Sequence, residues 1–432
     1  MPTLSVVMIV RDEANWLPAC LESVRDIADT IVIGDTGSTD NSVDIARTYG
    51  AHVLDVPWTH DFAAARNAVL AQAPGDWLLH MDADENLDAT GARAIRTLVN
   101  DDGCGADAVE VMLANYSDDI RAWRWVASPP NDPNARGRAG YIAVPLLRLF
   151  RNRRGFAYRE PVHENITESV IAYGGVIGQA HHITIHHHGF GQGRPEKAAR
   201  YLAIASAKTE QRPRDPKSWH DLAEQLVSMD RADEARIAAQ KALALDPTHL
   251  GAATTLANLL LNAGELDAAK EVLDPFSIPH DAPPHVLVAL SAIACRQGSP
   301  RDARALAERA RALAPGNIMA CFAAARACDI SGDSQAAQSH LEAAGVVAPG
   351  ISEVTDRIAA LDDRTRGEAL LAEGDAKSAL AVFVAALKRD PEDPLTHLGI
   401  GEALKMLGDA ARAQQSIDRA LKLAPSLPGR PE

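Results

Sequence analysis

The acidic residues of the segment 76–85 give the clearest indication of chemistry in the sequence. An apolar run that begins at Trp77 ends at three carboxylates, Asp82, Asp84 and Glu85. Successive side chains of a strand point to opposite faces, so Asp82 and Asp84 share a face if the strand continues through them. Two carboxylates at a strand end can hold a hard divalent cation. Taken alone, the pattern also fits a buried strand that ends in a polar turn.

The residues around this segment alternate between strand and helix patterns. We expect strands at 4–10, 30–34, 51–56 and about 77–81, with helices at 11–24, 42–49 and 62–73. This alternation predicts a parallel sheet with helices on both faces, whose ligand binds outside the carboxyl ends of the strands. Polar segments follow three of these strands, at 11–13, 35–40 and 82–85. We therefore predict one ligand site at that edge of the sheet.

Four motifs in this region resemble the N-terminal signature of family 2 glycosyltransferases, which have the α/β GT-A (Rossmann-like) fold. They lie at 5–14, 33–40, 61–67 and 81–85. The resemblance implies a nucleotide-sugar donor, Mg²⁺ or Mn²⁺ as cofactor, and inversion at the anomeric carbon. UDP is preferred only because the family commonly uses it.

The resemblance also implies roles for the positions that match these motifs. Asp82 and Asp84 would bind the metal, and a cation there would offset the charge of the departing diphosphate. Asp35 could instead cap a turn, and Arg66 could form an ordinary ion pair. The residues expected to bind the donor are Arg11, Asp12, Glu13, Asp35, Asp61, Arg66, Asp82 and Ala83.

The acceptor side is expected in the segment 160–190. An inverting transferase needs a general base, and Glu164 is our prediction, with Asp118 and Asp119 as alternatives. His163 would orient Glu164 or the acceptor. Both could also be ordinary polar residues of a loop.

A histidine cluster at 181–188 offers a third metal ligand. In a strand, His186 and His188 share one face and His187 lies on the other. The phrase ending in Gly189-Phe190 resembles the domain end of bacterial glycosyltransferases fused to tetratricopeptide-like repeats, including those that glycosylate bacteriocin peptides. That resemblance favours His187, then His188. The alternative is an independent zinc or copper site.

The second half of the chain is an array of 34-residue repeats. Ala235, Ala269, Ala303 and Ala337 share this spacing, and glycines and prolines repeat with it. The spacing slips once by eight residues near 352–363. The array resembles the tetratricopeptide repeat over about 216–425, or about six units, which predicts an all-α solenoid. Such surfaces usually bind peptides or proteins. The alternative is that the repeats only support the first domain or form a homodimer contact.

These observations divide the chain into a GT-A domain at 1–193, a linker helix at 194–215 and the repeats at 216–425. The net charge of −15 argues against nucleic acid as a partner. Five scattered cysteines fit a reducing cytoplasm, and no apolar run is long enough for a signal peptide or a membrane span.

The sequence therefore predicts a metal-dependent, inverting glycosyltransferase that moves a sugar from UDP-hexose or UDP-N-acetylhexosamine to a peptide or protein side chain. Two alternatives stay open. One is a saccharide or lipid-linked acceptor in envelope polysaccharide synthesis, and the other is a non-catalytic repeat scaffold. The sugar, the linkage (O-, S- or N-) and the metal-binding histidine among 186–188 also stay open.

Overall fold

The computed structural model describes residues 1–152, 154–162, 164–190, 195–278 and 282–427. The chain forms two compact units. The first contains residues 1–119 and 128–245, and the second contains residues 120–127 and 246–432. The short strand β7 (Trp125–Ala127) belongs to the second unit. Among the described residues, no helix is both long and apolar enough to cross a membrane.

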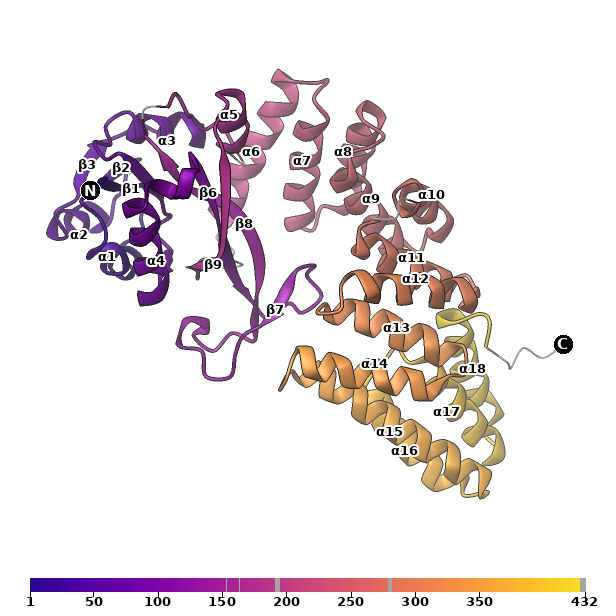
Figure 1. Ribbon diagram of the computed structural model, residues 1–432. Helices are drawn as coiled ribbons and strands as arrows, with labels where there is room; N and C mark the ends of the chain where they lie inside the picture. Colours follow the sequence, from indigo (N-terminus) through magenta and orange to yellow (C-terminus); the bar gives the residue numbers. More distant parts are fainter. Residues whose placement is uncertain (153, 163, 191–194, 279–281, 428–432) are drawn as a thin grey trace. The chain divides into compact units, whose positions relative to one another are not determined.

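The first unit is built on a mixed sheet (Figure 1). Its strands follow the order β3-β2-β1-β4-β8-β6-β9-β5. The first four are parallel, and Val10 of β1 lies opposite Asp35 of β2, so their carboxyl ends share one edge. The strands are β1 (Leu4–Val10), β2 (Thr30–Asp35), β3 (His52–Asp55), β4 (Trp77–His80), β5 (Glu85–Leu87), β6 (Ala108–Ser117), β8 (Gly140–Arg151) and β9 (Ile177–His187).

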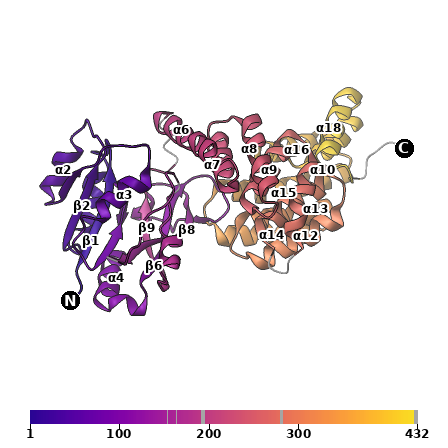
Figure 2. The ribbon, with the colours of Figure 1, turned by 90° about the horizontal axis from the view of Figure 1, so that it is seen from above.

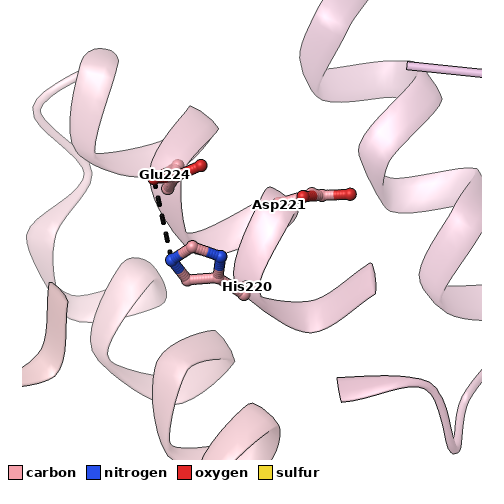
Figure 3. A group of neighbouring side chains, drawn as sticks. All are labelled: His220, Asp221 and Glu224. Carbon is pink, nitrogen blue, oxygen red and sulfur yellow. Dashed lines mark ion pairs between the residues drawn. The ribbon is translucent and has the colours of Figure 1, made fainter. Parts of the chain in front are cut away.

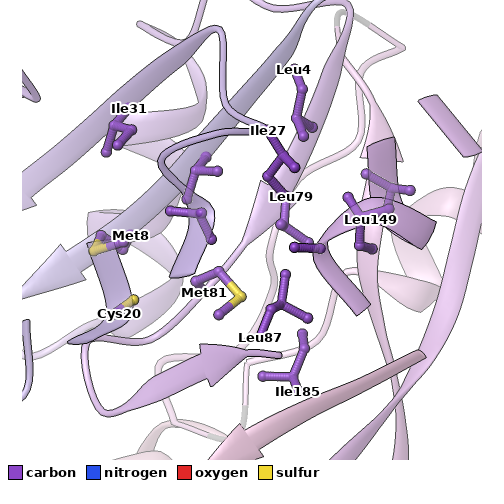
Figure 4. Close-up of a cluster of buried hydrophobic side chains, with 14 of the residues drawn as sticks. Leu4, Met8, Cys20, Ile27, Ile31, Leu79, Met81, Leu87, Leu149 and Ile185 are labelled. Atoms are coloured by element: carbon purple, nitrogen blue, oxygen red, sulfur yellow. The ribbon is translucent and has the colours of Figure 1, made fainter. Parts of the chain in front are cut away.

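Helices cover both faces of this sheet, as the alternating pattern predicted. Alternate residues of β1 enter two separate cores: Leu4 and Met8 pack in one, and Val7 packs in the other. Figure 4 shows the first core, where Cys20 of helix α1 and Leu79 of β4 also lie. The helices are α1 (Leu17–Val24), α2 (Ser42–Thr48), α3 (Phe62–Leu70), α4 (Ala89–Asn100) and α5 (Thr167–Ala172), with short 3₁₀ helices η1 (Asp102–Gly105) and η2 (Pro133–Ala135).

The first helix begins later than the pattern suggested. Residues 11–16 form bends and turns, and α1 starts at Leu17 with Pro18 in its first turn. Proline is well suited to that position because its missing N–H would have no partner in the helix. The segment that follows β1 is therefore free to bend over the sheet edge, and Asp12 there has a positive φ of 56°.

Helix α6 (Pro195–Gln211) follows β9 and packs beside α7 (Pro216–Ser228) in the first unit, as both ribbon views show (Figures 1 and 2). It occupies the place of the expected linker helix. The same unit also includes α8 (Ala232–Leu245).

The remaining helices form consecutive packed pairs in the second unit. Glycines with φ between 76° and 85° lie between the paired helices at 264, 298, 332, 374 and 408, where L-residues are disfavoured. The eight extra residues in the repeat spacing lengthen one helix: α15 has 21 residues, whereas α13 and α17 have 13 each. These helices are α9 (Leu250–Ala263), α10 (Leu266–Ser277), α11 (Pro284–Arg296), α12 (Pro300–Leu313), α13 (Ile318–Ile330), α14 (Ser334–Val347), α15 (Ser352–Ala372), α16 (Ala376–Arg389), α17 (Pro394–Met406) and α18 (Ala410–Leu423).

Candidate active site

A cavity of about 350 Å³ lies at the carboxyl ends of the parallel strands. Residues that follow β1, β2 and β4 meet there, although Arg11 and Asp84 are 73 positions apart in the sequence. Aromatic and basic side chains from α3, β9 and α6 complete the wall. The lining residues are Ile9, Val10, Arg11, Asp12, Glu13, Thr36, Trp58, Phe62, Arg66, Asp82, Ala83, Asp84, His187, Arg200 and Tyr201.

Hydrogen bonds join the turns after β1 and β2. Asp12 Oδ1 accepts from the Thr39 N–H at 2.7 Å, and the Asp12 N–H donates to Ser38 Oγ at 3.0 Å. The positive φ of Asp12 is a conformation that aspartate tolerates better than most residues. These contacts hold the acidic end of β1 against the neighbouring turn.

Two predicted donor ligands cap local structure. Asp35 accepts from the N–H groups of Gly37 and Ser38, each at 3.2 Å, and so closes its own turn. Asp61 is the N-cap of α3 and accepts from the Ala64 N–H at 2.9 Å. Among the described residues, the cavity lining includes Thr36 beside Asp35, and Phe62 beside Asp61, but neither aspartate.

Arg66 links the predicted metal site to the predicted base. It is only 8% exposed. Its Nε donates to Glu164 Oε1 at 2.7 Å, and its Nη2 donates to Asp82 Oδ1 at 3.0 Å. Burial alone would lower the pKa of Arg66, but the charges of Asp82 and Glu164 raise it. Its Nη1 has no hydrogen-bond partner in the part of the chain that the structure describes.

A second arginine approaches Asp82 from the sheet. Arg148 of β8 lies 3.5 Å from Asp82 Oδ2 and donates to Glu85 Oε1 at 2.7 Å. Burial opposes ionisation of Asp82, but Arg66 and Arg148 hold its pKa well below the usual value. Burial also raises the pKa of Glu85, to about 7. Asp82 is therefore the more readily ionised of the two carboxyl groups.

His80 completes this network below the cavity. Its Nε2 lies 3.3 Å from Asp82 Oδ1, and its Nδ1 lies 2.7 Å from the Tyr158 hydroxyl. Burial, together with Arg66 and Arg148, holds the pKa of His80 well below its usual value. His80 is therefore neutral. No sequence motif pointed to His80, Arg148 or Tyr158, although a charged residue inside the apolar strand β8 implies a buried partner.

Asp84 and His187 form the part of the site that best fits a divalent cation. Asp84 Oδ2 lies 3.3 Å from His187 Nε2. Two ligands at right angles on Mg²⁺, each about 2.1 Å from the ion, are about 3 Å apart. His187 Nδ1 lies 2.6 Å from Asn115 Oδ1. Since that oxygen can only accept, Nδ1 carries the proton, which presents Nε2 toward Asp84.

The side chain of Asp84 occupies the space that a Cβ at position 189 would take. A Cβ on Gly189 would lie 1.9 Å from Asp84 Oδ2.

Burial alone would lower the pKa of His187, but the hydrogen bond and charge of Asp84 raise it. A carboxylate and an imidazole held this close can share either a proton or a metal ion.

His186 and His188 lie in a separate aromatic cluster. The His188 ring stacks on Tyr116, with centroids 5.2 Å apart, and on Trp16 at 6.2 Å. Its Nε2 lies 2.7 Å from Asn86 Oδ1. His186 Nδ1 lies 2.9 Å from the Tyr116 hydroxyl. Neither ring lines the cavity within the described ranges, whereas His187 does.

One further cluster has the composition of a metal site. His220, Asp221 and Glu224 of α7 place their ligand atoms within 4.8 Å of one another (Figure 3). Asp221, however, is already paired with Lys208 at 2.7 Å and with Lys217 at 3.0 Å. We therefore assign no metal to this group. His163, the predicted orienting residue, lies outside the described residues.

The fold and the cavity define an α/β domain with a polar ligand site, joined to a helical repeat array. Residues 5–165 match the family model Glycosyl transferase family 2, and residues 226–285 and 370–428 match the family model Tetratricopeptide repeat. The chain therefore carries a glycosyl transferase family 2 domain followed by tetratricopeptide repeats, which confirms the predicted fold class.

Curated relatives agree with both parts. A TPR repeat-containing protein of Synechococcus elongatus is 35% identical over 181 residues, which is 40% of this chain and 37% of that protein. An uncharacterized glycosyltransferase of Rickettsia prowazekii is 33% identical over 20% of this chain and 30% of its own length. The SPbeta prophage-derived glycosyltransferase SunS of Bacillus subtilis is 34% identical over 19% of this chain and 20% of its own length.

The chain thus spans between 20% and 37% of the length of these relatives. Among solved structures, the TPR protein YrrB aligns with 51% of this chain and 92% of its own, at 16% identity and a TM-score of 0.27. That score is too low for a functional comparison.

Proposed function

We propose that this protein is a metal-dependent, inverting glycosyltransferase that moves a sugar from a nucleotide-sugar, preferably a UDP-sugar, to a peptide or protein side chain. The observation that carries the proposal is the setting of Arg66. This buried guanidinium contacts both Asp82 and Glu164 at the cavity wall, and its Nη1 has no partner among the described residues. A phosphate oxygen is the kind of anionic acceptor that such a donor selects.

The charges around the cavity favour a divalent cation beside the donor. Four carboxylates and three guanidiniums line the wall. A diphosphate alone would meet like charges there, whereas Mg²⁺ or Mn²⁺ on Asp84 and His187 would offset them. Asp82 would add a further ligand, since each carboxylate oxygen keeps a lone pair beside its bond to arginine. When bound, the cation stabilises the charge of the departing diphosphate.

Glu164 is the general base of this proposal. Arg66 joins its carboxylate to Asp82 of the cavity wall. Among the described residues Glu164 does not itself line the cavity, so an acceptor hydroxyl or thiol would have to reach it beside Arg66. The acceptor proton would pass to Glu164 as the acceptor heteroatom attacks the anomeric carbon and the nucleoside diphosphate leaves. His163 stays a proposed orienting residue.

The repeats support a peptide or protein as the acceptor. Tetratricopeptide units stack into extended surfaces, and surfaces of this kind bind peptides. A saccharide or lipid-linked acceptor would need no such surface.

The proposal is tested by incubating the full chain and Mn²⁺ with UDP-, GDP- and dTDP-sugars and a library of peptides, and detecting glycosylated product by mass spectrometry. An Asp82→Ala, Asp84→Ala double variant should lose activity, and EDTA should abolish it. Full activity of the double variant would refute the metal site. Transfer to oligosaccharides or lipid-linked sugars, with no peptide modified, would refute the peptide acceptor.

A further inference from the structure

Helix α6 contributes two side chains to the cavity that no motif predicted. Arg200 and Tyr201 lie in the cavity wall together with Arg11, Asp84 and His187. From its position between the catalytic motifs and the repeats, this helix was expected to serve only as a linker.

Aromatic contacts hold this part of α6 against the sheet domain. Tyr201 stacks on Phe62, with ring centroids 5.3 Å apart, and Phe62 packs edge-on against Trp58 at 4.7 Å. The Arg200 guanidinium lies 6.0 Å from the centre of the Trp58 ring. Arg200 is therefore positioned by a ring face, a contact that leaves its N–H groups able to bind a ligand.

The charges near Arg200 point to an anionic ligand. No carboxylate within the described ranges forms an ion pair with Arg200, in contrast to Arg66 and Arg148 in the same region. Burial and the charges of Glu164 and Asp82 raise the pKa of Tyr201, so its phenol keeps its proton. Both side chains thus offer hydrogen-bond donors to the cavity.

The far end of α6 is anchored as well. Lys208 is 2% exposed and lies 2.8 Å from Glu160 and 2.7 Å from Asp221 of α7. Arg212 adds a contact to Glu160 at 2.6 Å. Because Glu160 immediately precedes the loop that carries Glu164, this ion-pair group fixes α6 relative to the catalytic loop.

We propose that Arg200 binds the diphosphate of the donor, so that α6 is part of the active site rather than a spacer between domains. The inference rests on the proposed function, because it assigns a further residue to the same donor. Trp58 positions this guanidinium through its ring face, and Tyr201 holds α6 in place through its stacking on Phe62.

The test is binding of Mn²⁺-pyrophosphate and Mn²⁺-UDP to the full chain, measured by isothermal titration calorimetry. Arg200→Ala should weaken both ligands roughly tenfold or more, the usual effect of losing a charge-assisted hydrogen bond. Arg200→Lys should restore part of the affinity, since lysine keeps the charge without the fork. The matched control is Arg214→Ala, an exposed arginine in the segment that follows α6, which should bind as the wild type does.

Mn²⁺ alone provides a second readout, because a collapsed cavity would weaken Mn²⁺ binding, whereas loss of a phosphate contact would not. Wild-type affinity of Arg200→Ala for pyrophosphate and UDP would overturn the inference and leave the proposed function intact. Equal losses for Mn²⁺ and the diphosphates would also overturn it. If the wild type bound neither diphosphate, both the inference and the proposed function would fail.

Discussion

Lys208 of α6 and Glu160, four residues before Glu164, form an ion pair of 2.8 Å in which the lysine side chain is 1% exposed and the glutamate side chain 19% exposed. Glu160 has a positive φ of 78°, a strained conformation for a residue with a long side chain. The lysine pairs with the side chain of this residue, and the ion pair links α6 to the segment before Glu164.

Replacing Lys208 with methionine should destabilise the first unit. Loss of one partner of a buried ion pair costs free energy of unfolding, about 3 kcal/mol at the low end of the usual range. We expect the low end because Arg212 and Lys217 remain near the two carboxylates. A urea titration that follows the unfolding of α6 would show this loss of stability as a lower midpoint. Lys217→Met, which removes a half-exposed lysine from Asp221, should cost under about 1 kcal/mol. Equal midpoints for the two variants would contradict this reading.

The same ion pair predicts a dependence of stability on pH. Burial would raise the pKa of Glu160, but hydrogen bonds from Lys208 and Arg212 hold it below the usual value. A carboxyl group with a lowered folded-state pKa contributes stability above its unfolded-state pKa and loses it as pH falls through the folded-state pKa. Unfolding free energies of wild type and Glu160→Gln should therefore differ most at pH 6 and converge below about pH 4. A constant difference would refute the prediction.

A single methyl group at position 189 should disable the proposed metal site without replacing either of its proposed ligands, Asp84 and His187. The Cβ of Gly189→Ala would take the place of Asp84 Oδ2, from which it is 1.9 Å. Displacement of a ligand of this kind lowers metal affinity roughly tenfold or more. Mn²⁺ titration followed by electron paramagnetic resonance measures this loss. Gly316→Ala, where nothing lies within 4 Å of the new Cβ, is the control.

The neighbouring histidines should respond differently to substitution. His187→Ala removes the nitrogen beside Asp84 and should weaken Mn²⁺ binding roughly tenfold or more. His188→Gln can keep the hydrogen bond to Asn86 and should leave Mn²⁺ affinity unchanged. Burial and the nearby Arg136 lower the pKa of His188 to about 4, so its ring is neutral and serves in stacking. The opposite order of effects would reassign the metal ligand to His188.

Glu164→Gln tests the base. Glutamine can still accept from Arg66, so donor KM should change little, while kcat should fall about 100-fold or more through loss of proton transfer. Glu168→Gln, an exposed carboxylate four residues away, should leave both constants at wild-type values. An unchanged kcat in Glu164→Gln would direct attention to Asp118 or Asp119.

Much of the architecture could be predicted because it depends on local patterns. The apolar run at Leu4–Val10 and the acidic end of β4 placed both strands and their shared edge. The 34-residue period placed the paired helices, and the eight-residue slip corresponded to a longer α15.

The side-chain partners depend on contacts between distant positions, and periodicity contains no information about these. Arg148 meets Glu85 across the sheet, and Arg200 reaches the cavity from a helix over a hundred positions beyond Asp84. Asp35 was predicted as a donor ligand from its motif, and the structure adds that it accepts hydrogen bonds from the N–H groups of its own turn.

Trp58 gives the cavity an optical signal of its own. Its indole ring forms part of the wall, under Arg200 and against Phe62. A donor that draws Arg200 away from the ring would alter the emission of this tryptophan directly. Ligand arrival could therefore be followed in real time by intrinsic fluorescence, with no label and before any acceptor has been identified.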